Sequence, residues 1–205
     1  LQYYKPGDYN TEVAYMGCRT RVMGNVHDRS REVTCGRGNL SFTSINLPRI
    51  GIEAHGDVKK FYAILDERID LVIRQLLHRF KIQCSKKVYN YPFLMGQGVW
   101  LDSDKLKWTD SVAEVLKHGT LSIGFIGLAE ALKALTGKHH GESEASQKLG
   151  LGIIGHMRKR MDDESARTGL NFTLLATPAE GLSGRFVKID KKKYGVIPGV
   201  TDREY

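Results

Sequence analysis

The stretch that decides the fold runs from Asn39 to Cys84. It opens with "NLSFTSINL" (Asn39–Leu47), whose mix of β-branched, aromatic and small polar residues predicts a strand. "DVKKFYAILDERIDLVIRQLLHRFKIQC" (Asp57–Cys84) follows, with apolar residues at steps of three and four that predict one long helix with a core-facing stripe. Asp57 is the expected N-cap of this helix, and Pro48 is expected to end the strand before it. A strand followed by a long amphipathic helix favours an α/β fold.

The rest of the chain continues this alternation. "TDSVAEVLKHG" predicts a short helix, and "TLSIGFIGL" (Thr120–Leu128) predicts a buried strand that leads through "AEALKAL" into a helix ending at Gly137. "ESEASQKLGLGIIGHMRKRMDDESARTG" predicts a second long helix, and "NFTLLATPAEG" predicts a strand that turns at Pro178. No repeat or linker interrupts this order, so we expect residues 1–205 to form one α/β domain.

Composition narrows the class of protein. The chain has 205 residues, 41% of them hydrophobic, and no apolar run of the length needed to cross a bilayer, so membrane anchoring is not expected. The formal net charge of +8 suits a small polyanion such as a nucleotide triphosphate as well as a nucleic acid. The densest basic run, "KIDKKKYG" (Lys188–Gly195), has no interleaved aromatic residues and is interpreted as a solvated surface turn, so no direct nucleic-acid binding is expected.

The cysteines indicate the redox environment of the protein, and the two chain ends indicate whether the sequence is a fragment. Cys18, Cys35 and Cys84 are widely spaced and form no CxxC pair, which favours a reducing, cytoplasmic setting over a disulfide framework or a zinc ribbon. The chain begins and ends abruptly, without a targeting pattern, and we expect it to be an internal fragment of a longer protein.

Short motifs offer little chemistry on their own. No P-loop is present, "GLGIIG" (Gly150–Gly155) lies inside a helical phrase, and "HHGE" (His139–Glu142) is interpreted as a polar loop without a metal. The backbone and hydroxyl groups of "LLATPAEGLSGRF" (Leu174–Phe186) could bind phosphate at a helix start. Taken alone, the phrase favours an ordinary turn with Thr177 as N-cap and Pro178 as the first helical residue.

Cys18 is the most unusual residue. In "AYMGCRTRV" (Ala14–Val22) it lies between Gly17 and Arg19, which suits a tight polar loop tip better than a core strand. Asn39 stands at the start of a strand, where its amide could both donate to and accept from a hydroxyl. A cysteine, an asparagine and a phosphate-suited turn, without a base or a metal, fit neither hydrolysis nor metal chemistry.

Several long phrases, in a fixed order, carry a resemblance to a known family. From about Tyr15 to the end of the chain, the sequence resembles the catalytic subunit of anaerobic (class III) ribonucleotide reductases, which are glycyl-radical enzymes. The phrases are "YMGCRTRV", "GRGNLSFTSINLPRIGI", "GTLSIGFIGLAEAL", "NFTLLATPAEGLSGRF" and "KKKYGVIPGVTDREY". The resemblance implies part of a ten-stranded α/β barrel, made of two antiparallel halves of five parallel strands, into which a finger loop carries the active-site cysteine.

The resemblance also assigns roles to residues. Cys18 matches the fingertip cysteine that becomes a thiyl radical and takes the 3′ hydrogen of the ribose, after which the 2′-hydroxyl leaves as water. Met16 matches a methionine of the formate-using branch, and Asn39 matches an asparagine that hydrogen-bonds the ribose hydroxyls. The implied substrate-binding residues are Thr20, Thr177, Ala179, Glu180 and Gly181.

The implied activity is anaerobic, formate-dependent reduction of ribonucleoside triphosphates for DNA precursor synthesis. The family's partners follow: the ribonucleotide, formate, and an S-adenosylmethionine/iron–sulfur activase that makes the glycyl radical, in a cytoplasmic homodimer. The glycyl-radical motif of the RxxGY type, the four-cysteine zinc site and the N-terminal ATP-binding domain do not occur in this sequence. We therefore expect the isolated fragment to be inactive and to bind no cofactor itself.

Three alternatives stay open at this point. Another glycyl-radical enzyme, such as a pyruvate formate-lyase-type lyase, would usually present two adjacent thiols or a Cys/Glu pair, which Cys18 lacks. A non-catalytic module binding nucleotides or nucleic acid would draw on the net charge of +8. A purely structural domain would hold Cys18 as an inert core residue.

Overall fold

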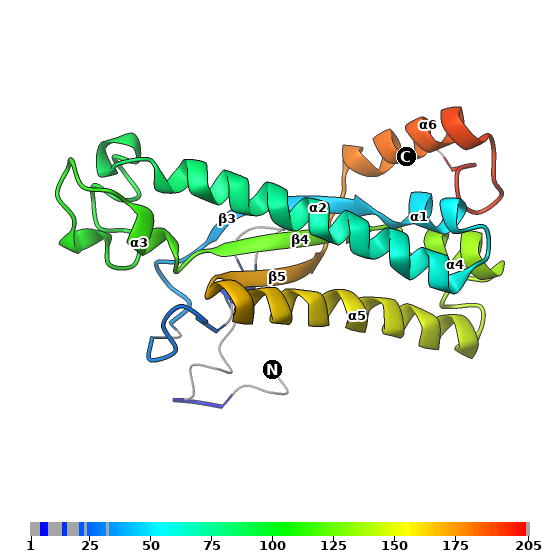
Figure 1. Cartoon of the computed structure of the whole chain (residues 1–205), viewed down its shortest axis with the longest axis horizontal. Coiled ribbons are helices and arrows are strands. Elements are labelled where there is room, and N and C mark those ends of the chain that lie inside the picture. The colour runs from blue at the N-terminus through cyan, green and yellow to red at the C-terminus, as the bar shows by residue number, and fades with distance from the viewer. Residues whose placement is uncertain (1–4, 8–13, 16–20, 23, 32, 204–205) are drawn as a thin grey trace. The chain divides into compact units, whose positions relative to one another are not determined.

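The structure is a computed structural model that describes residues 5–7, 14–15, 21–22, 24–31 and 33–203 (Figure 1). Strands and helices alternate along most of the chain, and their arrangement confirms the α/β class. In chain order the elements are β1 (Ala14–Tyr15), β2 (Arg21–Val22), β3 (Asn39–Asn46), α1 (Leu47–Ala54), α2 (Val58–Cys84), the short 3₁₀ turns η2 (Val88–Asn90) and η3 (Ser103–Lys105), α3 (Ala113–Leu116), β4 (Thr120–Ile126), α4 (Leu128–Thr136), α5 (Glu144–Thr168), β5 (Asn171–Ala176) and α6 (Gly181–Tyr194).

The three longer strands form a sheet in the order β3-β4-β5 and point the same way in Figure 1. Thr120 N–H donates to Gly38 O, which joins the beginnings of β3 and β4. Thr177 N–H donates to Phe125 O, which joins the ends of β4 and β5. Because beginnings meet beginnings and ends meet ends, the pairing is parallel. Helices connect the successive strands, as a parallel sheet requires.

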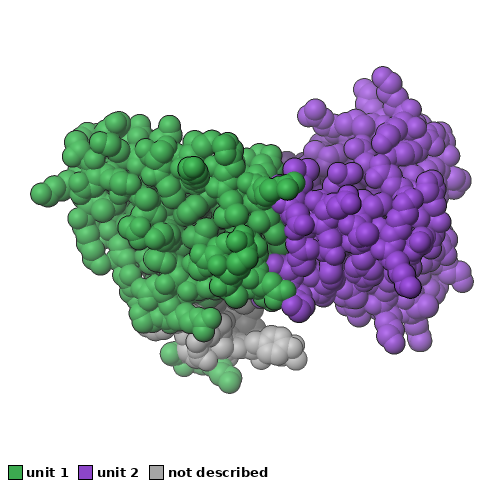
Figure 2. Space-filling model, in the orientation of Figure 1, with its two compact units in different colours: residues 1–43, 73–122, 161–173 green, residues 44–72, 123–160, 174–205 purple. Residues whose placement is uncertain are grey.

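The chain divides into two compact units, which Figure 2 colours separately. Unit 1 comprises residues 1–43, 73–122 and 161–173, and unit 2 comprises residues 44–72, 123–160 and 174–205. The division falls inside β3, β4, β5, α2 and α5, so both units contain parts of the same continuous elements. The assignment of a single domain over residues 1–205 stays a prediction.

Each unit has its own apolar core. In unit 1, the segment between α2 and β4 closes over a small cluster in which Trp100 Nε1 donates to Val115 O at 2.7 Å. The buried residues of that cluster are Val88, Met95, Trp100, Val112, Val115 and Leu116. In unit 2, α1 packs against α4, and a side chain at Gly51 would meet Ala131 O at 2.7 Å. Glycine at this position therefore permits the close approach of the two helices.

Most expected elements are confirmed, with two corrections. Asp57 caps α2 as predicted, because its Oδ1 accepts the N–H groups of Lys59 and Lys60 at 2.8 and 3.1 Å. Pro48 does not simply end a strand: it lies in the first turn of α1, where its fixed φ and missing N–H do no harm. Residues 188–195 are not a surface turn but the last part of α6 and its C-terminal glycine, because lysines favour helices and their charge suits a helix C-terminus.

Within the described ranges, no helix is both long and apolar enough to cross a membrane.

Candidate functional site

The turn from β5 to α6 holds four of the predicted substrate-binding residues. Thr177 N–H donates to Phe125 O at 3.0 Å, so Thr177 still belongs to the sheet. α6 begins at Gly181, with Glu180 as its N-cap at a φ of 46°. The ordinary-turn interpretation, with Thr177 as N-cap and Pro178 opening the helix, is therefore wrong, because the backbone of Thr177 is engaged by the neighbouring strand. Residues 178–180 form an irregular turn in front of the helix.

The amino end of α6 lies directly behind this turn. Leu182 N–H donates to Ala179 O at 2.9 Å and Ser183 N–H donates to Glu180 O at 3.3 Å, which closes the first turn of the helix. The helix is 14 residues long, so its amino end carries the partial positive charge of a helix dipole. A turn of this kind suits an anionic group such as phosphate.

A pair of hydroxyl groups lies on the strands just before the turn. Ser44 Oγ of β3 and Thr177 Oγ1 are 2.7 Å apart, and they meet over Gly124 of β4. A Cβ atom on Gly124 would come within 2.7 Å of Ser44 Oγ and closer still to Thr177 Oγ1. Glycine therefore makes the pair possible. Sequence reasoning missed Ser44 and Gly124, although an isolated glycine inside the strand "TLSIGFI" is a signal of close approach.

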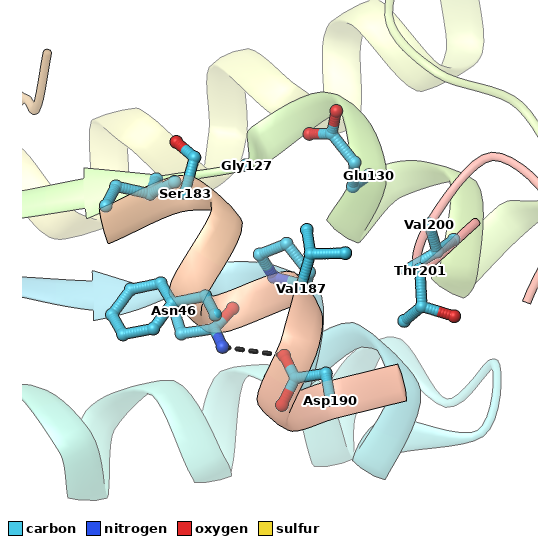
Figure 3. Close-up of a pocket in the computed structure, with 11 residues that line it drawn as sticks. Asn46, Gly127, Glu130, Ser183, Val187, Asp190, Val200 and Thr201 are labelled. Carbon is cyan, nitrogen blue, oxygen red and sulfur yellow. Dashed lines mark hydrogen bonds between the residues drawn. The ribbon is translucent and has the colours of Figure 1, made fainter. Parts of the chain in front are cut away.

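A cavity of about 130 Å³ adjoins the same helix in unit 2 (Figure 3). It lies where β3 and β4 end and where α1, α4 and α6 approach one another. Its volume is that of a few water molecules. Its walls combine polar and apolar side chains: Asn46, Glu130, Ser183, Asp190 and Thr201 on the polar side, and Pro48, Ile126, Phe186, Val187 and Val200 on the apolar side, with Gly127 completing the lining.

Asp190 connects α6 to the beginning of α1. The side chain is only 2% exposed. Its Oδ2 accepts from Asn46 Nδ2 at 2.7 Å, the bond drawn in Figure 3, and its Oδ1 accepts from Arg49 Nε at 2.7 Å. Asn46 also caps α1 by accepting from Arg49 N–H at 3.3 Å. The buried carboxylate is thus charge-balanced, and it holds α6 in place behind the β5–α6 turn. Sequence reasoning missed this interaction.

Asn39 is the first residue of β3, in unit 1, as predicted for a strand start. Its Oδ1 atom is buried and, among the described residues, accepts no hydrogen bond. A buried, unpaired amide oxygen costs about 1–3 kcal/mol, so such an atom is a natural acceptor for a ligand hydroxyl. Asn39 belongs to unit 1 and Thr177 to unit 2.

The predicted residues Met16, Cys18 and Thr20 lie outside the described residues. The two short strands on either side of them are described: β1 and β2 pair antiparallel, with Ala14 opposite Val22 and Tyr15 opposite Arg21. This pairing brackets residues 16–20, and Cys18 is the middle one of these five.

Cys35 and Cys84 are both described by the structure, and neither forms a disulfide. Cys35 is exposed, and Cys84 is partly buried, which raises the pKa of its thiol. Within the described parts of the chain, no cluster of three or more His, Cys, Asp or Glu side chains could hold a metal ion.

The fold is an α/β arrangement with a parallel sheet. Unit 2 holds a turn in front of α6, and unit 1 holds a buried amide oxygen at the start of β3. Comparison with known proteins identifies the family. The family model described as "Anaerobic ribonucleoside-triphosphate reductase" matches residues 1–205. The chain is 37% identical over 193 residues to the anaerobic ribonucleoside-triphosphate reductase of Salmonella typhimurium, covering 93% of this chain and 27% of that protein. It is 32% identical over 197 residues to the enzyme of the same name from Enterobacteria phage T4, covering 93% and 31%. The chain belongs to the anaerobic ribonucleoside-triphosphate reductase family, and it spans less than a third of the length of these relatives.

Solved structures agree on the fold. The anaerobic ribonucleotide reductase of Thermotoga maritima with citrate in the active site superposes with a TM-score of 0.62 at 20% identity, over 78% of this chain and 28% of that one. The same enzyme in complex with dATP and CTP superposes with a TM-score of 0.58 at 19% identity, over 78% and 25%. The α/β arrangement is therefore shared with a part of those structures.

Proposed function

We propose that this chain is the part of an anaerobic ribonucleoside-triphosphate reductase that carries the active-site cysteine and the substrate phosphate turn. The observation that carries the proposal is the family match over all 205 residues. In the overall reaction, ribonucleoside triphosphate, formate and one proton give deoxyribonucleoside triphosphate, carbon dioxide and water. Formate loses two electrons, and the C2′–OH bond of the ribose is replaced by C2′–H.

Cys18 is the proposed radical residue. Its thiyl radical takes the 3′ hydrogen atom from the ribose, the 2′-hydroxyl then leaves as water, and the hydrogen atom returns to C3′ at the end of the cycle. The reactive species is the radical and not the thiolate, so a low thiol pKa is not required. The antiparallel pairing of β1 with β2 supports the proposal, because it makes Cys18 the middle of a short connection, as expected of a finger loop.

Asn39 is proposed to hold the ribose hydroxyls. A hydroxyl is both donor and acceptor, and the amide offers the complementary pair of groups. The buried Oδ1 without a partner among the described residues supports this role, since a bound hydroxyl would supply the missing hydrogen bond.

The β5–α6 turn is proposed to bind the phosphates. Thr177, Ala179, Glu180 and Gly181 lie at the amino end of α6, where backbone N–H groups and the helix dipole favour an anion. The Ser44–Thr177 hydroxyl pair supports the role because it holds the beginning of the turn against β3. Thr20 is the remaining proposed contact to the substrate.

Formate is the proposed reductant, and Met16 is proposed to lie beside it and Cys18. The initiating glycyl radical, its S-adenosylmethionine-dependent activase, the four-cysteine zinc site and ATP binding are proposed to involve segments beyond this chain, in a cytoplasmic homodimer. We further propose that the parallel strands β3, β4 and β5 form part of a ten-stranded barrel that shields the sugar radical from solvent.

The experiment uses the full-length protein, activated under anaerobic conditions and given a ribonucleoside triphosphate and ¹³C-formate. Deoxyribonucleotide and ¹³C-carbon dioxide are expected in equal amounts. Cys18→Ser should abolish both products, whereas the control Cys35→Ser, which changes an exposed cysteine, should leave them unchanged. Turnover by Cys18→Ser, or deoxyribonucleotide formed without labelled carbon dioxide, would refute the thiyl step or the formate step respectively.

A further inference from the structure

A row of polar side chains on α2 fastens the beginning of β3, the strand that starts at Asn39. The row consists of Gln75, Arg79 and Gln83, which belong to unit 1 and lie on one face of the helix because they are four residues apart. We propose that Gln83, the last of the row, is a positioning residue that holds Asn39 in place for the ribose. This proposal rests on the proposed function, which assigns Asn39 to the ribose hydroxyls.

The first two residues of the row contact β3 further along the strand. Gln75 Oε1 accepts from Thr43 Oγ1 at 2.9 Å, and Arg79 NH1 donates to Phe42 O at 3.2 Å. Both bonds are exposed, so they compete with water and contribute little to stability. They show that each later turn of α2 reaches an earlier residue of β3, and the last turn therefore reaches the start of the strand.

Gln83 makes the contact nearest to Asn39. Its Nε2 donates to Leu40 O at 2.9 Å in partly buried surroundings, and Leu40 directly follows Asn39 in the chain. On the other side of Asn39, Gly38 O accepts from Thr120 N–H at 2.9 Å. Asn39 is therefore held between two fastened carbonyl groups, one bonded to the beginning of β4 and the other to the end of α2.

The orientation of the Gln83 amide follows from its partner. A carbonyl oxygen can only accept, so the NH₂ group of Gln83 faces Leu40 O and the amide oxygen faces away. That oxygen, Oε1, is buried and, within the described residues, accepts no hydrogen bond. An apolar side chain at this position would avoid the cost of an unpaired buried oxygen. The donor is thus kept at the expense of stability, which indicates a role other than holding the fold together.

The consequence concerns how Asn39 meets the sugar. In the described part of the chain, no bond to Asn39 Oδ1 fixes the amide, so its position depends on the backbone on either side. Without Gln83, Leu40 O loses its donor from α2, and the first residues of β3 can shift. A displacement of about 1 Å at a group that positions the substrate costs up to about 10²-fold in rate. A smaller shift should lower the affinity for the ribose hydroxyls and the rate together.

The experiment uses the full-length protein with substitutions in α2 and β3. Gln83→Met keeps the length and helix propensity of the side chain and removes the donor. Gln83→Lys restores a donor, with a charge that suits the last turn of α2. Gln75→Met is the matched control, because it is the same substitution on the same helix face and removes the bond to Thr43 instead. Asn39→Ala, alone and combined with Gln83→Met, tests whether Gln83 acts through Asn39.

Two nucleotides that differ only in the 2′-hydroxyl give the main readout. The dissociation constants of CTP and dCTP are measured by equilibrium dialysis without radical activation, so that CTP is not consumed. Their ratio reports the contribution of the ribose hydroxyl to binding. The melting temperature of each variant is measured as well, and the activated protein gives kcat/KM for CTP.

We expect Gln83→Met to lower the preference for CTP over dCTP about fivefold and kcat/KM about tenfold. Its melting temperature should change little, because removal of the unpaired oxygen offsets the lost hydrogen bond. Gln83→Lys should recover most of both losses, and Gln75→Met should match the wild-type protein. In the Asn39→Ala background, Gln83→Met should have no further effect.

The proposal is overturned if Gln83→Met keeps the wild-type preference while Asn39→Ala loses it, or if the two effects add. It is also overturned if Gln75→Met loses as much as Gln83→Met, or if Gln83→Met weakens CTP and dCTP equally and lowers the melting temperature, as a structural residue would. If Asn39→Ala itself leaves the preference unchanged, the ribose role of Asn39 in the proposed function is refuted, and the positioning role of Gln83 is refuted with it.

Discussion

Gly124→Ala should disrupt the hydroxyl pair that holds the β5–α6 turn. The added Cβ would lie 2.7 Å from Ser44 Oγ and closer to Thr177 Oγ1, both inside the 3.0 Å that real Cβ atoms keep from such neighbours. Gly124 is not at a positive φ, so the backbone accepts alanine and the cost is steric. Displacing both hydroxyls combines overpacking of about 1–3 kcal/mol with one lost hydrogen bond of about 1 kcal/mol. Alanine returns about 0.5 kcal/mol by restricting the unfolded chain. The net loss of unfolding free energy should be about 2.5 kcal/mol.

The assay is urea unfolding of the purified variants, combined with the KM for the ribonucleoside triphosphate in the full-length protein. Thr177→Ala removes the nearest atom and leaves Thr177 Cβ 3.4 Å from the added carbon, an ordinary contact. Gly124→Ala/Thr177→Ala should therefore be more stable than Gly124→Ala by about 1 kcal/mol. Gly155→Ala is the control, because a Cβ there meets nothing within 4 Å. If Gly124→Ala is as stable as Gly155→Ala, or if removing the Thr177 hydroxyl recovers nothing, the packing argument is refuted.

Three further predictions concern charge, pH and the ribose contact. Asp190→Asn should lower the unfolding free energy by about 2 kcal/mol in urea, because Arg49 loses its buried partner, and an unchanged midpoint would contradict the role of Asp190 in holding α6. Since burial lowers the pKa of His118 below its unfolded value of about 6.5, the unfolded state binds the proton first, and stability should fall as pH drops from about 6.5 toward the folded pKa. The pH dependence of the melting temperature should flatten in His118→Asn. An unaltered slope would show that His118 does not cause this pH dependence. Asn39→Ala should lower kcat/KM by about 10²-fold with little change in melting temperature, because its Oδ1 accepts no bond among the described residues. If Asn39→Ala lowered the melting temperature strongly as well as kcat/KM, Asn39 would instead be a structural residue.

The elements that could be predicted from sequence are those whose signal is local. The apolar period of residues 57–84 identifies α2, and its cap at Asp57 needs only the next three residues. The role of Pro48 was harder to predict, because proline both ends strands and opens helices. The helix that it opens, α1, is only eight residues long. The choice depends on packing against α4, which no local pattern shows.

The residues that sequence reasoning missed are brought together by long-range pairing. Ser44 and Thr177 are 133 positions apart, and they meet because the strand order β3-β4-β5 puts Gly124 between them. Asn25 and His118 are 93 positions apart, and nothing in their neighbours indicates the contact. Long-range hydrogen bonds of this kind require the fold to be known first. Asn39 and the β5–α6 turn could be proposed as site residues from the sequence because long phrases around them resemble a known family.

The most direct test of the central claim is anaerobic product analysis with the activated full-length protein and its Cys18→Ser variant. The account predicts that the wild-type protein converts a ribonucleoside triphosphate to its deoxy form, with loss of the 2′-hydroxyl as water. It predicts that Cys18→Ser binds the same nucleotide equally well and forms no deoxyribonucleotide. Deoxyribonucleotide formation by Cys18→Ser at the wild-type rate would contradict the claim that this chain supplies the radical cysteine.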